Sequence, residues 1–200
     1  SYTPVSSANL ALLCAPSAST ALCTISSAAE LALFNSILAN GTFASANSLI
    51  ELERIAQFSK NVIAGVQPSA GDFVAMGFAS VTTADMALIW PQILASAGGA
   101  SGRDSFAEIT NLIERALAKK TALAELAYFD AASSSAPTLQ TYLVAGIDGV
   151  NSANINMLNA LLRDLGPAET STPEQLQALV ALANRLLDLA DGSKDGESRL

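Results

Sequence analysis

A cluster of oxygen-bearing side chains near the C-terminal end has the spacing of a metal-binding loop. Its first, third, fifth and sixth positions are Asp191, Ser193, Asp195 and Gly196, and Glu197 follows. Calcium-binding loops supply ligands from such alternate positions and turn sharply at a glycine. The bidentate carboxylate expected at the twelfth position would lie beyond the 200-residue sequence. We therefore treat the segment as a candidate calcium loop, with a polar linker as the alternative, and expect no other metal site.

The chain has two cysteines, Cys14 and Cys23, which lie nine residues apart on either side of Pro16. They could close a short loop as a disulfide, which requires an oxidising compartment. Such a bridge stabilises a small loop by roughly 2–3 kcal/mol. The alternative is a pair of buried free thiols that act as small apolar side chains. We favour the disulfide because both cysteines lie in one loop-like stretch.

Other residues that could carry out a reaction are missing or wrongly spaced. The chain has no histidine, which removes the commonest general base and the Ser/His/Asp and Cys/His nucleophile systems. Glu51 and Glu53 lie two residues apart on a predicted helix, where they do not face each other. The glycine-rich stretch Gly98–Gly102 lacks the Lys-Ser/Thr of a phosphate-binding loop. We expect a protein without enzymatic activity and without a cofactor.

Charge and hydropathy narrow the class of partner. Only 14% of the residues are charged and the net charge is −8, with the basic residues scattered apart from Lys119 and Lys120. No basic stripe is present to neutralise phosphates, so nucleic acid is not an expected partner. The sequence contains no run of about 18 apolar residues, so it predicts no transmembrane segment. The neutral polar surface favours an extracellular or cell-surface protein that binds a protein partner or itself.

Helix start signals recur along the chain. At four predicted helix starts a Ser or Thr is followed three residues later by Glu or Gln: Ser27/Glu30, Ser48/Glu51, Ser105/Glu108 and Thr172/Gln175. In such a capping box each side chain binds the main-chain N–H of the other residue. Apolar residues then follow at three- and four-residue steps, the period of one helix face. The sequence predicts an all-α protein with helices over residues 8–13, 25–40, 48–65, 68–77, 81–94, 105–128, 137–146, 150–165 and 172–190.

The helix pattern repeats. The same apolar positions recur in three predicted helix pairs as Leu33, Phe34, Ile37 and Leu38, then Ile89, Trp90, Ile93 and Leu94, then Leu158 and Leu162. A short helix that follows a proline precedes the second and the third pair. Internal repeats of this size indicate tandem supersecondary units. We therefore predict tandem small helical bundles with about three helices per repeat unit.

The repeat and its breaks predict the domain organisation. Residues 1–66 form a divergent N-terminal helical unit that includes the loop between the cysteines. Residues 67–129 form one helical module, and the Ser/Ala-rich residues 130–136 form a linker. Residues 137–192 form a second helical module, and residues 193–200 form a polar tail.

One stretch resembles a known family. Tyr-x-x-x-Gly-Ile-x-Gly-Val (Tyr142–Val150), Asn151-x-x-Asn154 and Thr-x-x-Gln-Leu-x-x-Leu-Val-x-x-Ala (Thr172–Ala183) follow one another. This order resembles small three-helix modules, similar to albumin-binding GA modules, that repeat in large bacterial surface and secreted adhesin-type proteins. The resemblance extends over residues 137–192 and more loosely over 68–127. It implies a bacterial, exported, repetitive protein, and it carries over no binding residue because the matches are core and cap positions.

These observations lead to one main hypothesis and two alternatives. The main hypothesis is a structural or adhesive repeat region, without enzymatic activity, of an exported bacterial surface protein. The first alternative is a secreted protein that holds a hydrophobic ligand inside a single helical bundle, lined by some of Phe34, Phe43, Phe58, Phe73, Trp90 and Phe106. The second is a self-assembling filament or surface-layer subunit, which the almost uncharged first fifty residues would suit.

Overall fold

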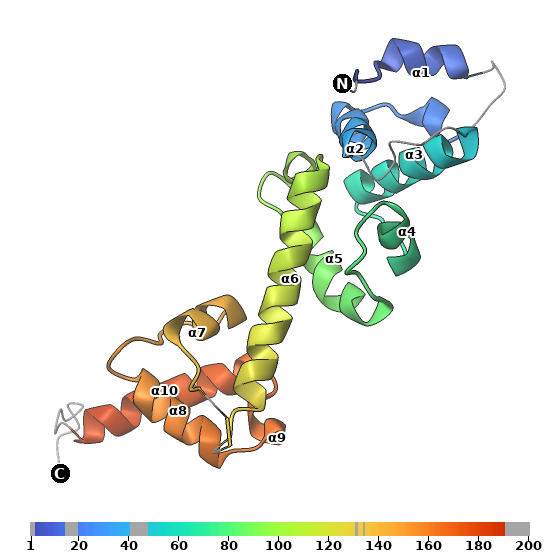
Figure 1. The fold of residues 1–200 in the computed structure, drawn as a ribbon. Coiled ribbons are helices and arrows are strands. Elements are labelled where there is room, and N and C mark those ends of the chain that lie inside the picture. Colours follow the sequence, from blue (N-terminus) through green and yellow to red (C-terminus); the bar gives the residue numbers. More distant parts are fainter. Residues whose placement is uncertain (1–2, 15–19, 41–47, 131, 134, 191–200) are drawn as a thin grey trace. The chain divides into compact units, whose positions relative to one another are not determined.

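A computed structural model describes residues 3–14, 20–40, 48–130, 132–133 and 135–190 of the chain (Figure 1). Within these ranges the chain forms ten α-helices and three short 3-10 helices, and no strand. The predicted all-α fold class is confirmed for the described residues. The tandem repeat of three-helix units stays a prediction.

The chain divides into two compact units, unit 1 (Ser1–Ala116) and unit 2 (Leu117–Leu200). The division falls inside helix α6 (Phe106–Ala127), which has 22 residues and continues past the two lysines as the sequence predicts. The predicted module boundaries and the linker at 130–136 stay predictions. Each unit is described by itself below.

In the first part of unit 1, α2 and α3 begin where their capping residues predict. α1 (Ser7–Leu13), a 3-10 turn (Leu22–Thr24), α2 (Ala28–Ala39) and α3 (Leu49–Ala64) follow one another along the chain. Capping boxes are present at the start of α2 and of α3, and α3 ends at Gly65 with φ of 75°. α2 packs against α3, and their shared core consists of Leu33, Phe34, Ile37, Ile55, Ala56, Phe58 and Val62.

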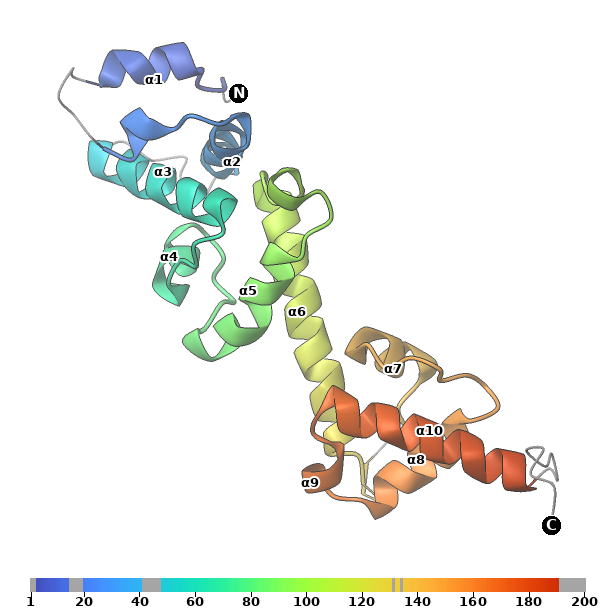
Figure 2. The same cartoon turned by 180° about the vertical axis from the view of Figure 1, so that it is seen from behind.

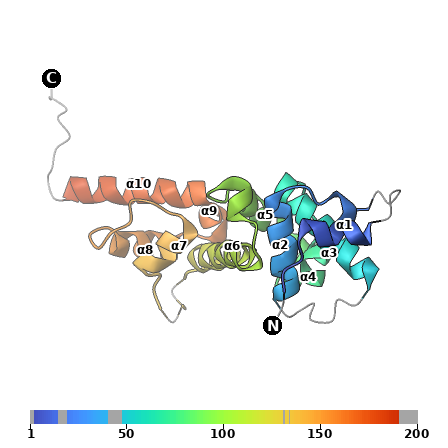
Figure 3. The same ribbon diagram turned by 90° about the horizontal axis from the view of Figure 1, so that it is seen from above.

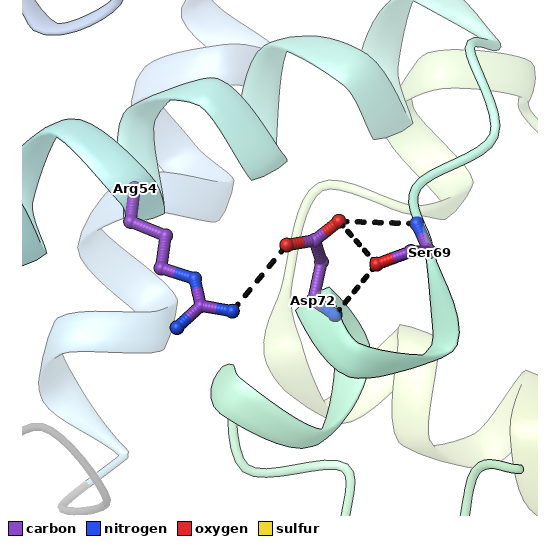
Figure 4. A network of polar contacts seen from close by, with 3 residues as sticks. All are labelled: Arg54, Ser69 and Asp72. Atoms are coloured by element: carbon purple, nitrogen blue, oxygen red, sulfur yellow. Dashed lines mark hydrogen bonds and ion pairs between the residues drawn. The ribbon is translucent and has the colours of Figure 1, made fainter.

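The rest of unit 1 contains α4 (Ala70–Ala75), α5 (Met86–Leu94) and the first part of α6. α4 is shorter than the predicted range 68–77, because it begins after its N-cap Ser69 and ends before its C-cap Met76. Its start is tied to α3 through Asp72, which accepts hydrogen bonds from the Ser69 N–H and hydroxyl at 3.1 and 2.7 Å and forms an ion pair with Arg54 at 3.5 Å (Figure 4). The Ser69 hydroxyl bond is the main reason that the pKa of Asp72 lies below its usual value.

An aromatic cluster joins α3, α4 and α6 inside unit 1. Phe58 and Phe73 meet edge to face with ring centroids 5.1 Å apart, and Phe78 contacts both rings. Phe78 also stacks on Phe106, the first residue of α6, with centroids 4.4 Å apart. Such aromatic pairs add about 0.5–1.5 kcal/mol beyond their buried area. This cluster therefore holds the start of α6 against the end of α4.

Unit 2 contains the second part of α6, α7 (Leu139–Ala145), α8 (Ile155–Asp164), α9 (Pro167–Thr170) and α10 (Pro173–Ala190). α8 packs against α10, and α7 lies beside the second part of α6 (Figures 2 and 3). The core contains Leu126, Tyr142, Ile147, Leu158, Leu162, Leu176, Val180 and Ala183. α9 lies between the predicted helices 150–165 and 172–190, and it was not predicted because a Gly-Pro pair such as Gly166-Pro167 is also a signal that ends a helix.

Buried amides hold the loops of unit 2 to its helices. Asn154 is almost fully buried, donates to the main-chain oxygen of Gly149 and to the Asn184 side chain, both at 2.8 Å, and accepts from the Asn151 N–H at 2.8 Å. Because buried polar groups without partners are costly, these bonds are needed for the Asn154 amide to be buried at all. The Asn154 amide thus fixes the loop before α8 against α10.

Candidate functional site

A groove of about 330 Å³ lies on unit 2 between α6 and α7. Its lining residues are Ala118, Thr121, Ala122, Glu125, Thr138, Gln140, Thr141 and Val144. The α6 members are three and four residues apart, so they form one stripe of the helix. The lining combines the apolar side chains of Ala118, Ala122 and Val144 with threonine, glutamine and glutamate side chains, which we call its polar wall.

The start of α7 sets the polar wall of this groove. Thr138 is the N-cap of α7, and the side chains of Thr138 and Thr141 each accept the other residue's main-chain N–H at 3.2 Å. The Thr141 hydroxyl also donates to the Glu125 carboxylate on α6 at 3.2 Å. One hydrogen-bonded chain of side chains therefore connects the two helices across the groove and leaves further oxygen lone pairs to accept hydrogen bonds.

Two exposed leucines adjoin the groove. Leu139 and Leu143 on α7 are 44% and 67% exposed, and each directly precedes a residue that lines the groove, Gln140 and Val144. Four residues apart, the two leucines lie on the same face of α7. A single exposed leucine is ordinary on a protein surface, but a pair beside a groove with a polar wall has the arrangement of an apolar anchor with a polar rim.

Unit 1 has a cavity of about 320 Å³ where the aromatic cluster meets the surface. It is lined by Gly77, Phe78, Ala79, Ser80, Phe106, Thr110, Ile113 and Glu114. The stacked rings of Phe78 and Phe106 form an apolar wall. The Thr110 hydroxyl already donates to the Phe106 main-chain oxygen at 2.9 Å, so it offers an incoming group only an acceptor.

The aromatic residues named from the sequence have different places. Phe106 lines the cavity, whereas Phe34, Phe58, Phe73 and Trp90 are buried in the core; Phe43 lies outside the described residues. Phe78 also lines the cavity, but it is not among the aromatic residues named from the sequence. It follows α4 in a segment without helical periodicity, so no pattern identified it as part of the aromatic cluster.

The predicted disulfide between Cys14 and Cys23 is present, with the two Cα atoms 5.6 Å apart. It joins the end of α1 to the 3-10 turn, whose Leu22 is buried and donates its N–H to the Glu53 carboxylate at 3.1 Å. Asn35 on α2 holds the other end of α1, because its side-chain amide exchanges two hydrogen bonds with the main chain of Val5, at 2.8 and 2.9 Å. α1 is therefore fastened at both ends.

In the described part of the chain, carboxylate side chains form hydrogen bonds with the starts of helices and with loops. Glu51 caps α3 while Glu53 binds Leu22, so these two carboxylates serve different partners as their spacing predicts. The pKa of Asp104 is raised, mainly by partial burial and then by the neighbouring Glu108 charge. Among the described residues no group of three or more Cys, Asp or Glu side chains could hold a metal ion. The candidate calcium loop Asp191–Glu197 lies outside them and stays a prediction.

Two negative findings complete the description. Across the described ranges, no helix is both long enough and apolar enough to cross a bilayer. Comparison of the chain with models of protein families, with curated proteins and with solved structures found no match.

Proposed function

We propose that this chain is a structural or adhesive segment, without enzymatic activity, of an exported bacterial surface protein, and that the groove between α6 and α7 binds a protein partner. The observation that carries the proposal is the pair of exposed leucines on α7 beside a groove with a hydrogen-bonded polar wall. Protein interfaces combine an apolar centre, which supplies most of the affinity, with a polar rim that fixes orientation.

The buried polar side chains support a structural role. Arg103, Asn154 and Thr170 all bind main-chain oxygens at helix ends or in loops. Thr170, for example, donates to the oxygen of Ala127 at 3.2 Å, which fastens α9 to the end of α6. Each of these groups holds a main-chain segment in place, as expected of a protein whose task is to keep helical surfaces in position.

Export is supported by the disulfide and by the composition. Disulfides persist in oxidising compartments and on cell surfaces, and this one closes the N-terminal part of unit 1. The low fraction of charged residues agrees with the same location. The resemblance of residues 137–192 to modules of bacterial adhesin-type proteins points the same way.

Cell attachment tests the adhesive role. A non-adhesive bacterial strain that displays the chain on its surface is added to wells coated separately with albumin, fibrinogen and fibronectin. We expect attachment to at least one coat, and at least tenfold weaker attachment when Leu139 and Leu143 are both replaced by serine. Leu88→Ser, at a similarly exposed leucine of unit 1, is the control. If the double variant attaches as well as the wild type, the groove is not the binding site. If the wild type attaches to none of the three coats, the adhesive role is contradicted.

The cavity beside Phe78 and Phe106 favours a second candidate function, the binding of a small hydrophobic ligand. Its volume lies at the lower end of the range for ligand pockets, about 300 Å³. The Glu114 carboxylate at the cavity disfavours an anionic ligand, so a neutral or cationic apolar molecule fits best. Titration with hexylamine and with hexanoate, followed by NMR, tests this: shifts of the Phe78 and Phe106 resonances with the amine alone would support it, and no shifts with either would exclude it.

A further inference from the structure

Helix α10 carries two apolar stripes, of which one has no cover in the described structure. Leu176, Leu179, Val180 and Ala183 face the core of unit 2 and are buried. The second stripe consists of Leu182, Leu186 and Leu189, which are 43%, 36% and 76% exposed. Steps of four and three residues place these leucines on one side of the helix. We call them the outer leucine stripe.

Charged residues beside this stripe are opposite in sign. Arg185 and Asp188 both lie on the exposed side of α10. Neither has an ion-pair partner among the residues that the structure describes. At 100° per residue both fall on the same flank of the outer leucine stripe. The flank therefore carries a positive group followed, about one turn later, by a negative one.

This arrangement is complementary to itself. Two α10 helices that pack antiparallel about a two-fold axis can place Leu186 against Leu186 of the second copy, and Leu182 against Leu189 of the second copy. The same register brings Arg185 opposite Asp188 of the second copy. Each pairing defines a register of one helix along the other, and the three registers differ by at most about two residues, or roughly 3 Å along the helix. In such an isologous contact the Leu182–Leu189 and Arg185–Asp188 pairings each occur twice, and the Leu186 pairing lies on the two-fold axis.

We propose that the outer leucine stripe of α10 docks antiparallel on α10 of a second copy of this chain. The proposal deepens the proposed structural or adhesive function, on which it rests, by naming one partner of that protein. A net charge of −8 makes close approach of two copies unfavourable over most of the surface. The alternating charges beside the outer leucine stripe give α10 a face where approach brings attraction and apolar burial together.

The alternatives fit this face less well. Residues 191–200, which follow α10, contain a single apolar residue, Leu200, so they offer no apolar stripe to cover three leucines. A single pair of helices buries less surface than the roughly 1,200–2,000 Å² of stable interfaces. The contact is therefore weak and depends on concentration.

Sedimentation velocity over about 5–500 μM chain tests the proposal. We expect a reversible monomer–dimer equilibrium in the wild type and at least tenfold weaker association when Leu182 and Leu189 are both replaced by glutamine. Leu88→Gln, at an exposed leucine of α5 outside both proposed surfaces, is the control and leaves dimerisation unchanged. Circular dichroism verifies that each variant keeps its helix content. A wild-type chain that stays monomeric throughout, or a leucine variant that dimerises as the wild type does, would overturn the proposal.

Charge reversal tests the antiparallel register, and it uses exposed residues that do not disturb the core. Arg185→Asp alone and Asp188→Arg alone each place like charges opposite one another, so each weakens self-association. Two recoveries are expected: the double variant R185D/D188R dimerises again, and a mixture of the two single variants forms a heterodimer. Failure of both recoveries would exclude this register. Two outcomes separate this proposal from the adhesive groove. The Leu139/Leu143 variant loses cell attachment and keeps dimerisation, and the Leu182/Leu189 variant loses dimerisation and keeps cell attachment.

Discussion

Arg103 donates a hydrogen bond from Nη2 to the main-chain oxygen of Ile63, 3.1 Å away, at the end of α3. Its Nη1 atom lies 3.4 and 3.3 Å from the oxygens of Ile93 and Leu94 at the end of α5. The last carbonyl groups of a helix have no partner within that helix, and the negative end of the helix dipole favours a cation there. One buried guanidinium thus satisfies the ends of two helices in unit 1.

Replacement of Arg103 tests this double cap. Arg103→Met keeps much of the apolar stem but removes the side-chain donors to the three carbonyl oxygens, of which only that of Ile93 keeps another donor, the Ser96 N–H, so the free energy of unfolding falls by about 2–3 kcal/mol. Urea denaturation followed through the fluorescence of Trp90, the single tryptophan and a residue of unit 1, measures the change. Arg115→Met, at an exposed position of α6, is the control and changes stability by less than about 0.5 kcal/mol. Equal effects of the two substitutions would contradict the capping role.

The Asn154 network predicts a sensitive position in unit 2. Asn154→Ala removes the donor to Gly149 and the partner of Asn184, and leaves buried polar groups unsatisfied. The expected loss is about 2 kcal/mol, seen as faster hydrogen exchange of α8 and α10 amides. Asn156→Ala, on the exposed side of α8, leaves exchange nearly unchanged. A protected α10 in the Asn154 variant would show that the network contributes little.

Reduction of the disulfide releases α1. Without the bridge between Cys14 and Cys23, unit 1 loses about 2–3 kcal/mol because the unfolded chain regains the entropy of an open loop. Amides of residues 7–13 exchange faster after dithiothreitol treatment, while amides of α10 keep their protection. The double variant C14S/C23S reproduces the effect without reductant, and it is then insensitive to dithiothreitol. Uniform loss of protection across the chain would contradict a local clamp.

Asp72 and Asp104 predict opposite contributions to acid stability. The Ser69 hydroxyl bond and the Arg54 charge lower the folded pKa of Asp72 below 3.8. Its stabilising contribution is therefore fully present above the unfolded pKa and is lost as pH falls through the folded value. The pKa of Asp104 is raised, so unit 1 gains stability when acidification protonates this group. NMR titration of the side-chain carboxyl carbons measures both values.

Substitution of the hydroxyl donor checks the cause of the Asp72 shift. Ser69→Ala removes the largest lowering interaction, so the pKa of Asp72 rises toward its usual value while that of Asp104 stays as it was. Arg54→Gln raises the Asp72 pKa by a smaller amount, because Arg54 is a weaker cause and both side chains are partly exposed. An Asp72 pKa that does not change in Ser69→Ala would rule out the hydroxyl bond as the cause.

Helix starts could be predicted from the sequence because capping is local. In the boxes Ser27/Glu30, Ser48/Glu51, Ser105/Glu108 and Thr172/Gln175 both residues lie within one turn, and all four are confirmed. Apolar periodicity also identified most of the buried face of each helix. The cysteine pair was recognisable for the same reason, since its members are only nine residues apart.

The candidate groove and the cavity could not be predicted in this way. The groove depends on how α7 lies against α6, and its polar wall depends on a contact between Thr141 and Glu125 from different helices. No periodic pattern in the sequence predicts that Phe78 belongs to the aromatic cluster. Likewise, three- and four-residue steps predict Leu186 on the same buried stripe of α10 as Leu179, yet packing leaves Leu186 36% exposed.

The sequence by itself determined that this chain is helical, where the four helices with predicted capping boxes begin and that two cysteines could close a loop, because the residues that decide these features lie within a few positions of each other. Only the tertiary structure decided that Arg103 binds the main-chain oxygens of helix residues 9 and 40 positions earlier, and which leucines remain on the surface. These features depend on the path of the intervening chain. A side chain is buried only where several helices that are separate in the sequence pack together, so its own neighbours in the sequence do not decide its burial.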